Sequence, residues 1–221
     1  MLREANSGWS SWKRSARIAV QSSRGQQRWV FAAAALTILL VTIELVILLV
    51  TGAEWRQLTS DPNGLAGQPW YFGFMEIASS LTLAAAAGIA LFTTGLIEGS
   101  ARRFIVAAGV FTLLLSLDDI YMLHEAISER SIYLLYGGYV LLLLVFNRDY
   151  LLRTPVVMAA AAVSCLVAAV VVDTATDWRF VNLKGAEEVL ELFAFCLWSA
   201  YLVTCSRRAI MEGQAAARVV R

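Results

Sequence analysis

Six apolar runs, each long enough for a helix to cross a membrane, constrain this chain more than any other feature. They are residues 29–51, 70–96, 104–123, 131–147, 155–173 and 186–206. A helix needs about 17 to 25 residues to cross about 30 Å of hydrocarbon, because each residue adds about 1.5 Å. Hydrophobic residues make up 59% of the chain and charged residues only 16%, which excludes an ordinary soluble domain. The runs predict an all-α, polytopic membrane helix bundle with six transmembrane helices.

The apolar runs divide the chain into three parts. We expect residues 1–28 to form a basic cytoplasmic or interfacial segment, residues 29–206 the six-helix transmembrane domain, and residues 207–221 a cytoplasmic tail. The first run is longer than the apolar core of a signal peptide and has no small-residue cleavage motif. We therefore interpret it as a membrane anchor.

The basic residues predict how the chain is oriented in the membrane. Short loops rich in Lys and Arg remain in the cytoplasm. Fourteen of the 18 Lys and Arg residues precede the first run, follow the last run, or lie in the second and fourth loops. The other four are Arg56, Arg130, Arg179 and Lys184. This distribution predicts a multi-pass protein of the plasma (inner) membrane with both termini in the cytoplasm.

Acidic residues gather on the opposite side, in the outer loops and the outer halves of the runs. Glu44, Glu76, Asp118 and Glu191 each lie five to seven residues from the outer end of a different run. At about 1.5 Å per residue, all four lie about 8 to 10 Å deep. A charge at the centre of a membrane helix costs about 2.5 to 3.5 kcal/mol on insertion scales, so intramembrane acids are by default candidates for function.

Two stretches add further polar residues to this level. In the stretch 118–125, Asp118 and Glu125 are seven residues apart and share one helix face, while His124 lies about 120° away from it. In the stretch 187–191, the three glutamates fall within an arc of about 100° and can face one groove. The four basic residues on this side all lie in loops and cannot neutralise so many acids by ion pairing. Bound protons or a bound cation must compensate the negative charge.

We therefore predict a metal site in the outer half of the bundle. Its candidate ligands are Glu44, Glu76, Asp118, Asp119, His124, Glu125, Glu187, Glu188 and Glu191. Carboxylates with a histidine suit Zn²⁺, Mn²⁺ or Fe²⁺, and carboxylates alone suit Ca²⁺, so the identity of the divalent metal ion stays open. In the alternative interpretation, the acids are protonated or hydrogen-bonded and only lock the helices together.

The two acidic stretches together carry a resemblance. Asp-Asp-x-x-x-x-His-Glu at 118–125, followed by Glu-Glu-x-x-Glu at 187–191, resembles a pattern in uncharacterised bacterial multi-pass membrane proteins. The resemblance covers about two of the six runs and implies no activity. Ceramidase-like membrane hydrolases are zinc enzymes that rely on several histidines, and a chain whose only histidine is His124 departs from them.

The leading hypothesis is a metal-dependent membrane enzyme that acts on a lipid or another hydrophobic substrate, with no catalytic residue assigned. One alternative is a proton- or cation-coupled transporter or channel, in which the same acids bind the ion in transit. Another is a structural or assembly subunit of a membrane complex. We expect membrane lipids as partners and no nucleic acid, and self-association or a partner within a membrane complex stays open.

Overall fold

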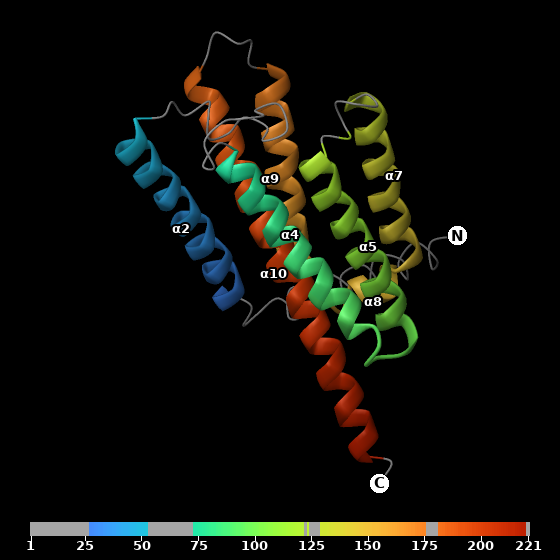
Figure 1. Ribbon diagram of the computed structural model, residues 1–221. Helices are drawn as coiled ribbons and strands as arrows, with labels where there is room; N and C mark the ends of the chain where they lie inside the picture. Colours follow the sequence, from blue (N-terminus) through green and yellow to red (C-terminus); the bar gives the residue numbers. More distant parts are fainter. Residues whose placement is uncertain (1–26, 53–72, 122, 124–128, 176–180, 220–221) are drawn as a thin grey trace, which may run out of the picture.

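The computed structural model describes residues 27–52, 73–121, 123, 129–175 and 181–219. All regular secondary structure in these ranges is helical (Figure 1). The helices are α2 (Gln27–Thr51), α4 (Phe74–Thr93), α5 (Gly99–Tyr121), α7 (Glu129–Phe146), α8 (Arg148–Leu151), α9 (Val156–Ala175) and α10 (Val181–Val219). The all-α prediction is therefore confirmed for this part of the chain.

One long helix lies within or across each of the six predicted runs, and α8 is a short addition between α7 and α9. Four segments are long and apolar enough to cross a membrane, namely α2, α4, α5 and Gly185–Ala215 of α10. Shorter apolar segments lie in α7 (Leu134–Phe146) and α9 (Val156–Val172). Helices of this length and composition are those of an integral membrane protein.

Helix α10 is the central element of the bundle and packs against α9, α4 and α2. Its fully buried side chains include Leu197, Tyr201 and Leu202. By contrast, α2 buries only Ala33, Thr37 and Glu44, which follow one another at helical spacing along a single stripe. One face of α2 therefore meets the bundle and the others point away from it.

Helices α4 and α5 form an antiparallel pair joined by residues 94–98. The small residues Ser80, Ala84 and Gly88 are four apart along α4, but Gly88 is exposed and has open space around it. The close approach is at Gly109 of α5, where an added Cβ would meet Leu91 Cγ at 3.2 Å and Ala90 Cβ at 3.3 Å. The face of α4 that meets α5 therefore includes Ser80 and Ala90 but not Gly88.

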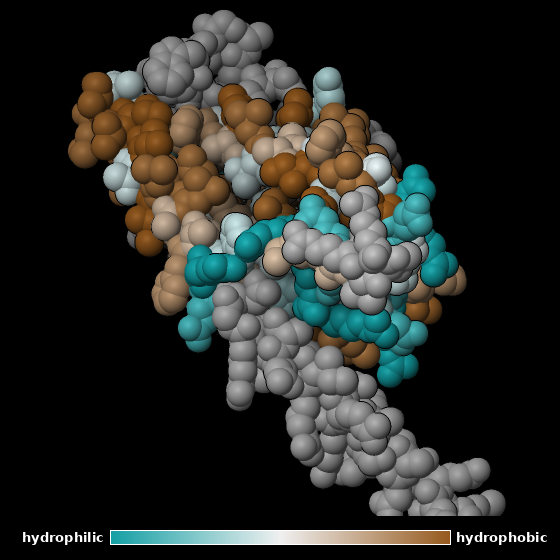
Figure 2. All heavy atoms as spheres, turned by 90° about the horizontal axis from the view of Figure 1, so that it is seen from below, coloured by the Kyte–Doolittle hydropathy of each residue, from teal (hydrophilic) through white to brown (hydrophobic). Residues whose placement is uncertain are grey.

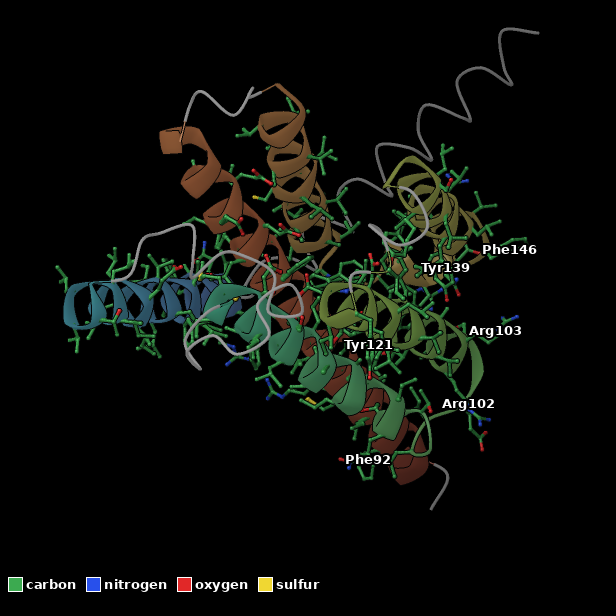
Figure 3. All side chains as sticks on the ribbon, turned by 45° about the horizontal axis from the view of Figure 1, so that its top comes forward. Phe92, Arg102, Arg103, Tyr121, Tyr139 and Phe146 are labelled. Carbon is green, nitrogen blue, oxygen red and sulfur yellow. The ribbon has the colours of Figure 1, made fainter. Side chains whose placement is uncertain are left out.

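The flanks of the bundle expose large apolar side chains. Phe92 of α4 is 76% exposed and Phe146 of α7 is 80% exposed, and both are labelled in Figure 3. Contiguous apolar surface of this kind is rare in soluble monomers. The view along the bundle in Figure 2 shows hydrophilic residues gathered at the near end and apolar residues on the flanks. This distribution suits a bundle surrounded by lipid.

The two ends of the bundle differ in charge. At one end, α2, α5 and α8 begin and α10 ends (Figure 1). We call it the arginine end, because it carries Arg28, Arg102, Arg103, Arg148, Arg153, Arg207 and Arg208. The opposite end, where α4 and α10 begin and α5 ends, carries those candidate acids that the structure describes and is called the acid end.

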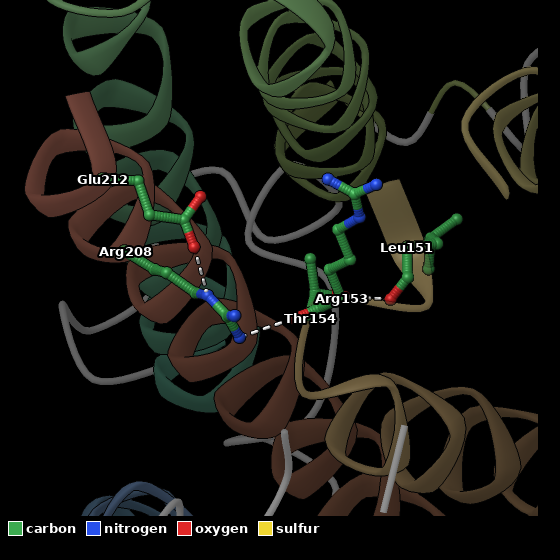
Figure 4. A network of polar contacts seen from close by, with 5 residues as sticks. All are labelled: Leu151, Arg153, Thr154, Arg208 and Glu212. Carbon is green, nitrogen blue, oxygen red and sulfur yellow. Dashed lines mark hydrogen bonds and ion pairs between the residues drawn. The ribbon is translucent and has the colours of Figure 1, made fainter. Parts of the chain in front are cut away.

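Helix α10 continues beyond the predicted span end at Ser206 and runs to Val219. Its 39 residues at about 1.5 Å each exceed the thickness of the hydrocarbon, so its last turns extend past the other helices (Figure 1). Arg208 Nε donates to Glu212 Oε1 at 2.7 Å, and its Nη1 donates to the Arg153 carbonyl (Figure 4). The contact with Arg153 joins the connection between α8 and α9 to α10.

Candidate acid site

The candidate site is built where α4 begins, α5 ends and α10 begins. Glu76 lies in the first turn of α4, and Asp118 and Asp119 lie in the last turn of α5. Glu188 and Glu191 lie near the start of α10. Because α5 runs antiparallel to α4 and α10 packs against α4, these segments meet at the acid end (Figure 1).

Asp119 joins α5 to α4 through two serines. Its Oδ2 atom accepts hydrogen bonds from Ser79 Oγ at 2.9 Å and from Ser80 Oγ. Ser79 Oγ also lies 2.9 Å from the Glu76 carbonyl oxygen, and its single proton can serve only one acceptor at a time. Below them, Ser116 Oγ donates to the Ser80 carbonyl at 2.9 Å. The Asp119 carboxyl group is therefore held in a fixed position against α4.

Glu76 is the residue on which the other acids converge. Its carboxyl group is within hydrogen-bonding reach of the Asp119 carboxyl group, and Glu188 and Glu191 are close enough to act on it electrostatically. We call Glu76, Asp119, Glu188 and Glu191 the acid site. It draws its four carboxyl groups from three helices.

Asp118 points to a different neighbour. It is 7% exposed, and its side chain is within hydrogen-bonding reach of Tyr136 on α7. The Tyr136 ring also packs edge-on against Phe111, with 5.8 Å between the ring centroids. We expected both aspartates to join Glu76 in one site, and Asp119 is the one within hydrogen-bonding reach of Glu76. Successive residues of a helix are about 100° apart, so the two aspartates cannot face the same helix.

Glu44 is separate from the acid site. It lies on the α2 stripe two turns beyond Thr37, which contacts Cys196 of α10. Its side chain is fully buried, and neither carboxyl oxygen forms a hydrogen bond within the described part of the chain. Burial is the only influence on the Glu44 carboxyl group among those residues, whereas Glu76 has charged neighbours. No contact among the described residues joins Glu44 to Glu76, so its membership of one site with the other acids stays a prediction.

The remaining candidate ligands are placed only in part. His124 and Glu125 lie outside the described residues, so their membership stays a prediction. Glu187 lies in α10 beside Glu188 but is not among the groups that act on Glu76. Within the described ranges, no group of three or more His, Cys, Asp or Glu residues is arranged to hold a metal ion. A metal would therefore require the acid-site carboxyl groups to move closer together.

Sequence reasoning missed a set of buried polar contacts between the acid site and the arginine end. Trp198 Nε1 donates to Thr112 Oγ1 at 2.8 Å, and the hydroxyl groups of Thr154 and Tyr201 are 3.0 Å apart. Thr112 Oγ1 also donates to the Ala108 carbonyl at 2.7 Å. Trp198 was the available signal, because a buried indole N–H normally finds an acceptor.

The comparisons with known proteins identify a family. No curated protein and no solved structure matches the chain. One family model matches residues 29–205. This range contains the helices of the bundle except for the first two residues of α2 and the last turns of α10. The chain therefore belongs to the family described as domain of unknown function DUF8692.

Proposed function

We propose that the protein is a six-span protein of the plasma (inner) membrane that binds a divalent cation at the acid site, in the outer half of the bundle. The observation that carries the proposal is the approach of four carboxyl groups from three helices around Glu76. Of the described arginines, all but Arg130, at the start of α7, lie at the opposite end of the bundle. Carboxyl groups crowded within a membrane must be compensated by protons or by a cation.

The chemistry of the acid site favours a hard cation. Carboxylate oxygens are the preferred ligands of Ca²⁺ and also suit Mn²⁺. Glutamate has three rotatable side-chain bonds, so Glu76, Glu188 and Glu191 have the rotational freedom to turn toward a shared ion. If His124 also reaches the ion, Zn²⁺ and Fe²⁺ become equally suitable.

The proposal extends to catalysis on a lipid or another hydrophobic substrate that reaches the site from the membrane. A bound divalent ion supplies a Lewis acid for such a reaction. A carboxyl group of the acid site that does not ligate the ion would then serve as a general base.

The experiment compares the metal content of protein purified in mild detergent with that of Glu191→Gln. We expect a stoichiometric divalent metal in the unmodified protein and a marked loss in the variant, which keeps the shape of the side chain but removes a charged ligand. Glu98→Gln, which lies in the connection between α4 and α5 at the arginine end, is the matched control and should retain the metal. Equal metal content in all three proteins, or none in the unmodified protein, contradicts the proposal.

A proton-coupled transporter is the second candidate, and the contact between Glu76 and Asp119 favours it. Two carboxyl groups within hydrogen-bonding reach can share and pass a proton. Buried hydroxyl groups such as Thr112 and Tyr201 continue toward the arginine end. Protein reconstituted into liposomes with an internal pH dye would then conduct protons, and Glu76→Gln would abolish the flux. A protein that binds no metal and conducts no protons would instead support a structural or assembly role in a membrane complex.

A further inference from the structure

A second site lies at the arginine end, between the start of α2 and the last turns of α10. A cavity of about 420 Å³ opens there and is lined by Arg28 and Trp29 of α2 and by Thr204, Arg207, Arg208 and Met211 of α10, among others. Small-molecule sites commonly measure about 300 to 1,000 Å³. We call this space the basic cavity. It shares no residue with the acid site.

The basic cavity has unbalanced positive charge within the described part of the chain. Of its three arginines, Arg208 is paired with Glu212 at 2.7 Å (Figure 4). Arg28 and Arg207 form no ion pair with another described residue. The Arg28 guanidinium carbon lies 6.0 Å from the centroid of the Trp29 ring, which leaves the edges of the guanidinium group available as donors. The cavity therefore suits an anion.

Thr204 provides an independent indication of a ligand. Threonines in these helices usually donate to the carbonyl four residues earlier, as Thr37, Thr82 and Thr112 do at 2.7 to 3.0 Å. Thr204 is only 6% exposed, and its Oγ1 atom makes no hydrogen bond within the described ranges. A buried hydroxyl group without a partner costs free energy, and here it borders the cavity with the arginines.

The surroundings of the cavity identify the kind of anion. Its wall includes an exposed apolar side chain, since Met211 is 56% exposed. Trp29 itself stands at the start of the apolar run of α2, where amphipathic rings mark the boundary between lipid and water. Basic pockets between membrane helices at this boundary are suited to anionic lipid headgroups.

We propose that the basic cavity binds the phosphate headgroup of an anionic phospholipid. Arg28 and Arg207 donate to the phosphate oxygens, the Thr204 hydroxyl group donates to the same headgroup, and the acyl chains extend along the apolar surface beside Met211. Glu212 also lines the cavity, and its carboxylate is neutralised by the ion pair with Arg208. Because α2 meets the bundle with a single narrow stripe, a lipid bound between α2 and α10 would also fasten α2 to the bundle.

The test uses full-length, delipidated protein in a neutral detergent. Its thermal unfolding is followed on addition of phosphatidylglycerol, of phosphatidylcholine, and of inorganic phosphate. We expect a saturable rise in the unfolding temperature with phosphatidylglycerol only, because a ligand that binds the folded state stabilises it. An equal response to inorganic phosphate would identify a free anion as the ligand, and an equal response to phosphatidylcholine would show general solvation by lipid. Either result overturns the proposal.

Variants locate the effect. Arg28→Gln combined with Arg207→Gln should weaken the apparent affinity for phosphatidylglycerol by about tenfold or more, because two charge-assisted contacts are lost. Thr204→Val, which keeps the shape of the side chain, should weaken it by a few fold. The control, Arg102→Gln with Arg103→Gln, removes the same charge at the same end but outside the cavity and should retain the affinity. The lipid does not bind in this cavity if the control loses as much affinity for phosphatidylglycerol as the first variant. The same holds if the first variant keeps its full affinity.

Discussion

Glu44 differs from Glu76 and Asp119 of the acid site in the hydrogen bonding of its carboxyl group. Asp119 has two serine donors, and Glu76 has Asp119, but both Glu44 oxygens are without a hydrogen bond among the described residues. A buried polar group without a partner costs about 1 to 3 kcal/mol. Glu44 is therefore a position at which the fold carries a cost.

This cost predicts the effect of Glu44→Leu, which has a similar volume and no polar atoms. The variant should be more stable, with a rise of about 2 to 4 °C in the unfolding temperature per kcal/mol recovered for a chain of this size. Thermal unfolding in detergent measures the change, and Glu98→Leu, on a connection outside the bundle, serves as the control. A less stable Glu44→Leu variant would show that Glu44 has a stabilising partner and would contradict this account.

Among the helices, the contact between α4 and α5 is the one that positions the acid site, because Asp119 meets Ser79 and Ser80 across it. Its closest point is Gly109, where an added Cβ would lie 3.2 Å from Leu91. Gly109→Leu should therefore force the two helices apart and lower the stability by about 1 to 3 kcal/mol, which is the usual cost of overpacking.

The matched control for this change is Gly88→Leu. Gly88 lies within a helix of the same pair, α4, but nothing lies within 4 Å of an added Cβ there. Leucine is the better helix former, so this variant should be neutral or slightly more stable. Thermal unfolding of both variants in the same detergent provides the comparison, and an equal loss at the two positions would show that Gly109 is not the contact.

The helices themselves were largely predictable from the sequence, and their rotation was not. The lengths of the apolar runs predict six long helices, since twenty apolar residues have few other structures in lipid. Most of these runs are apolar on every side, and a helix of that kind has no sequence signal for the face that meets its neighbours. This is why the sequence predicted that Glu76 and Glu191 lie at one level. It did not predict that Asp119 contacts Glu76 while Asp118 contacts Tyr136, nor that Glu44 has no hydrogen-bond partner among the described residues.

Helix ends show a second limit of the sequence. The prediction for the last span ended at Ser206, where the apolar run ends, but α10 continues to Val219. Residues 207–217 contain several strong helix formers, including a run of three alanines, and no proline. Hydropathy reports where a helix leaves lipid, and propensity decides where the helix stops.

For the whole molecule, the difference in charge between the two ends predicts the topology. The arginine end should face the cytoplasm, with both termini on that side, because basic residues resist transfer across the membrane. Reporter fusions at Ser100 and Arg153 should read cytoplasmic, and fusions at Gly64, Glu129 and Lys184 should read external. An inverted or irregular pattern would contradict both the number of spans and the outward position of the acid site.

Binding of Mn²⁺, followed by electron paramagnetic resonance, tests the central claim most directly, because the signal of the free aquated ion disappears when the ion binds. The purified protein should bind one Mn²⁺ per chain. Asp119→Asn should abolish this binding, whereas Asp118→Asn, whose side chain faces Tyr136, should weaken it far less. A protein that leaves the Mn²⁺ signal unchanged, or that loses binding equally in both variants, would contradict a cation held by Glu76, Asp119, Glu188 and Glu191.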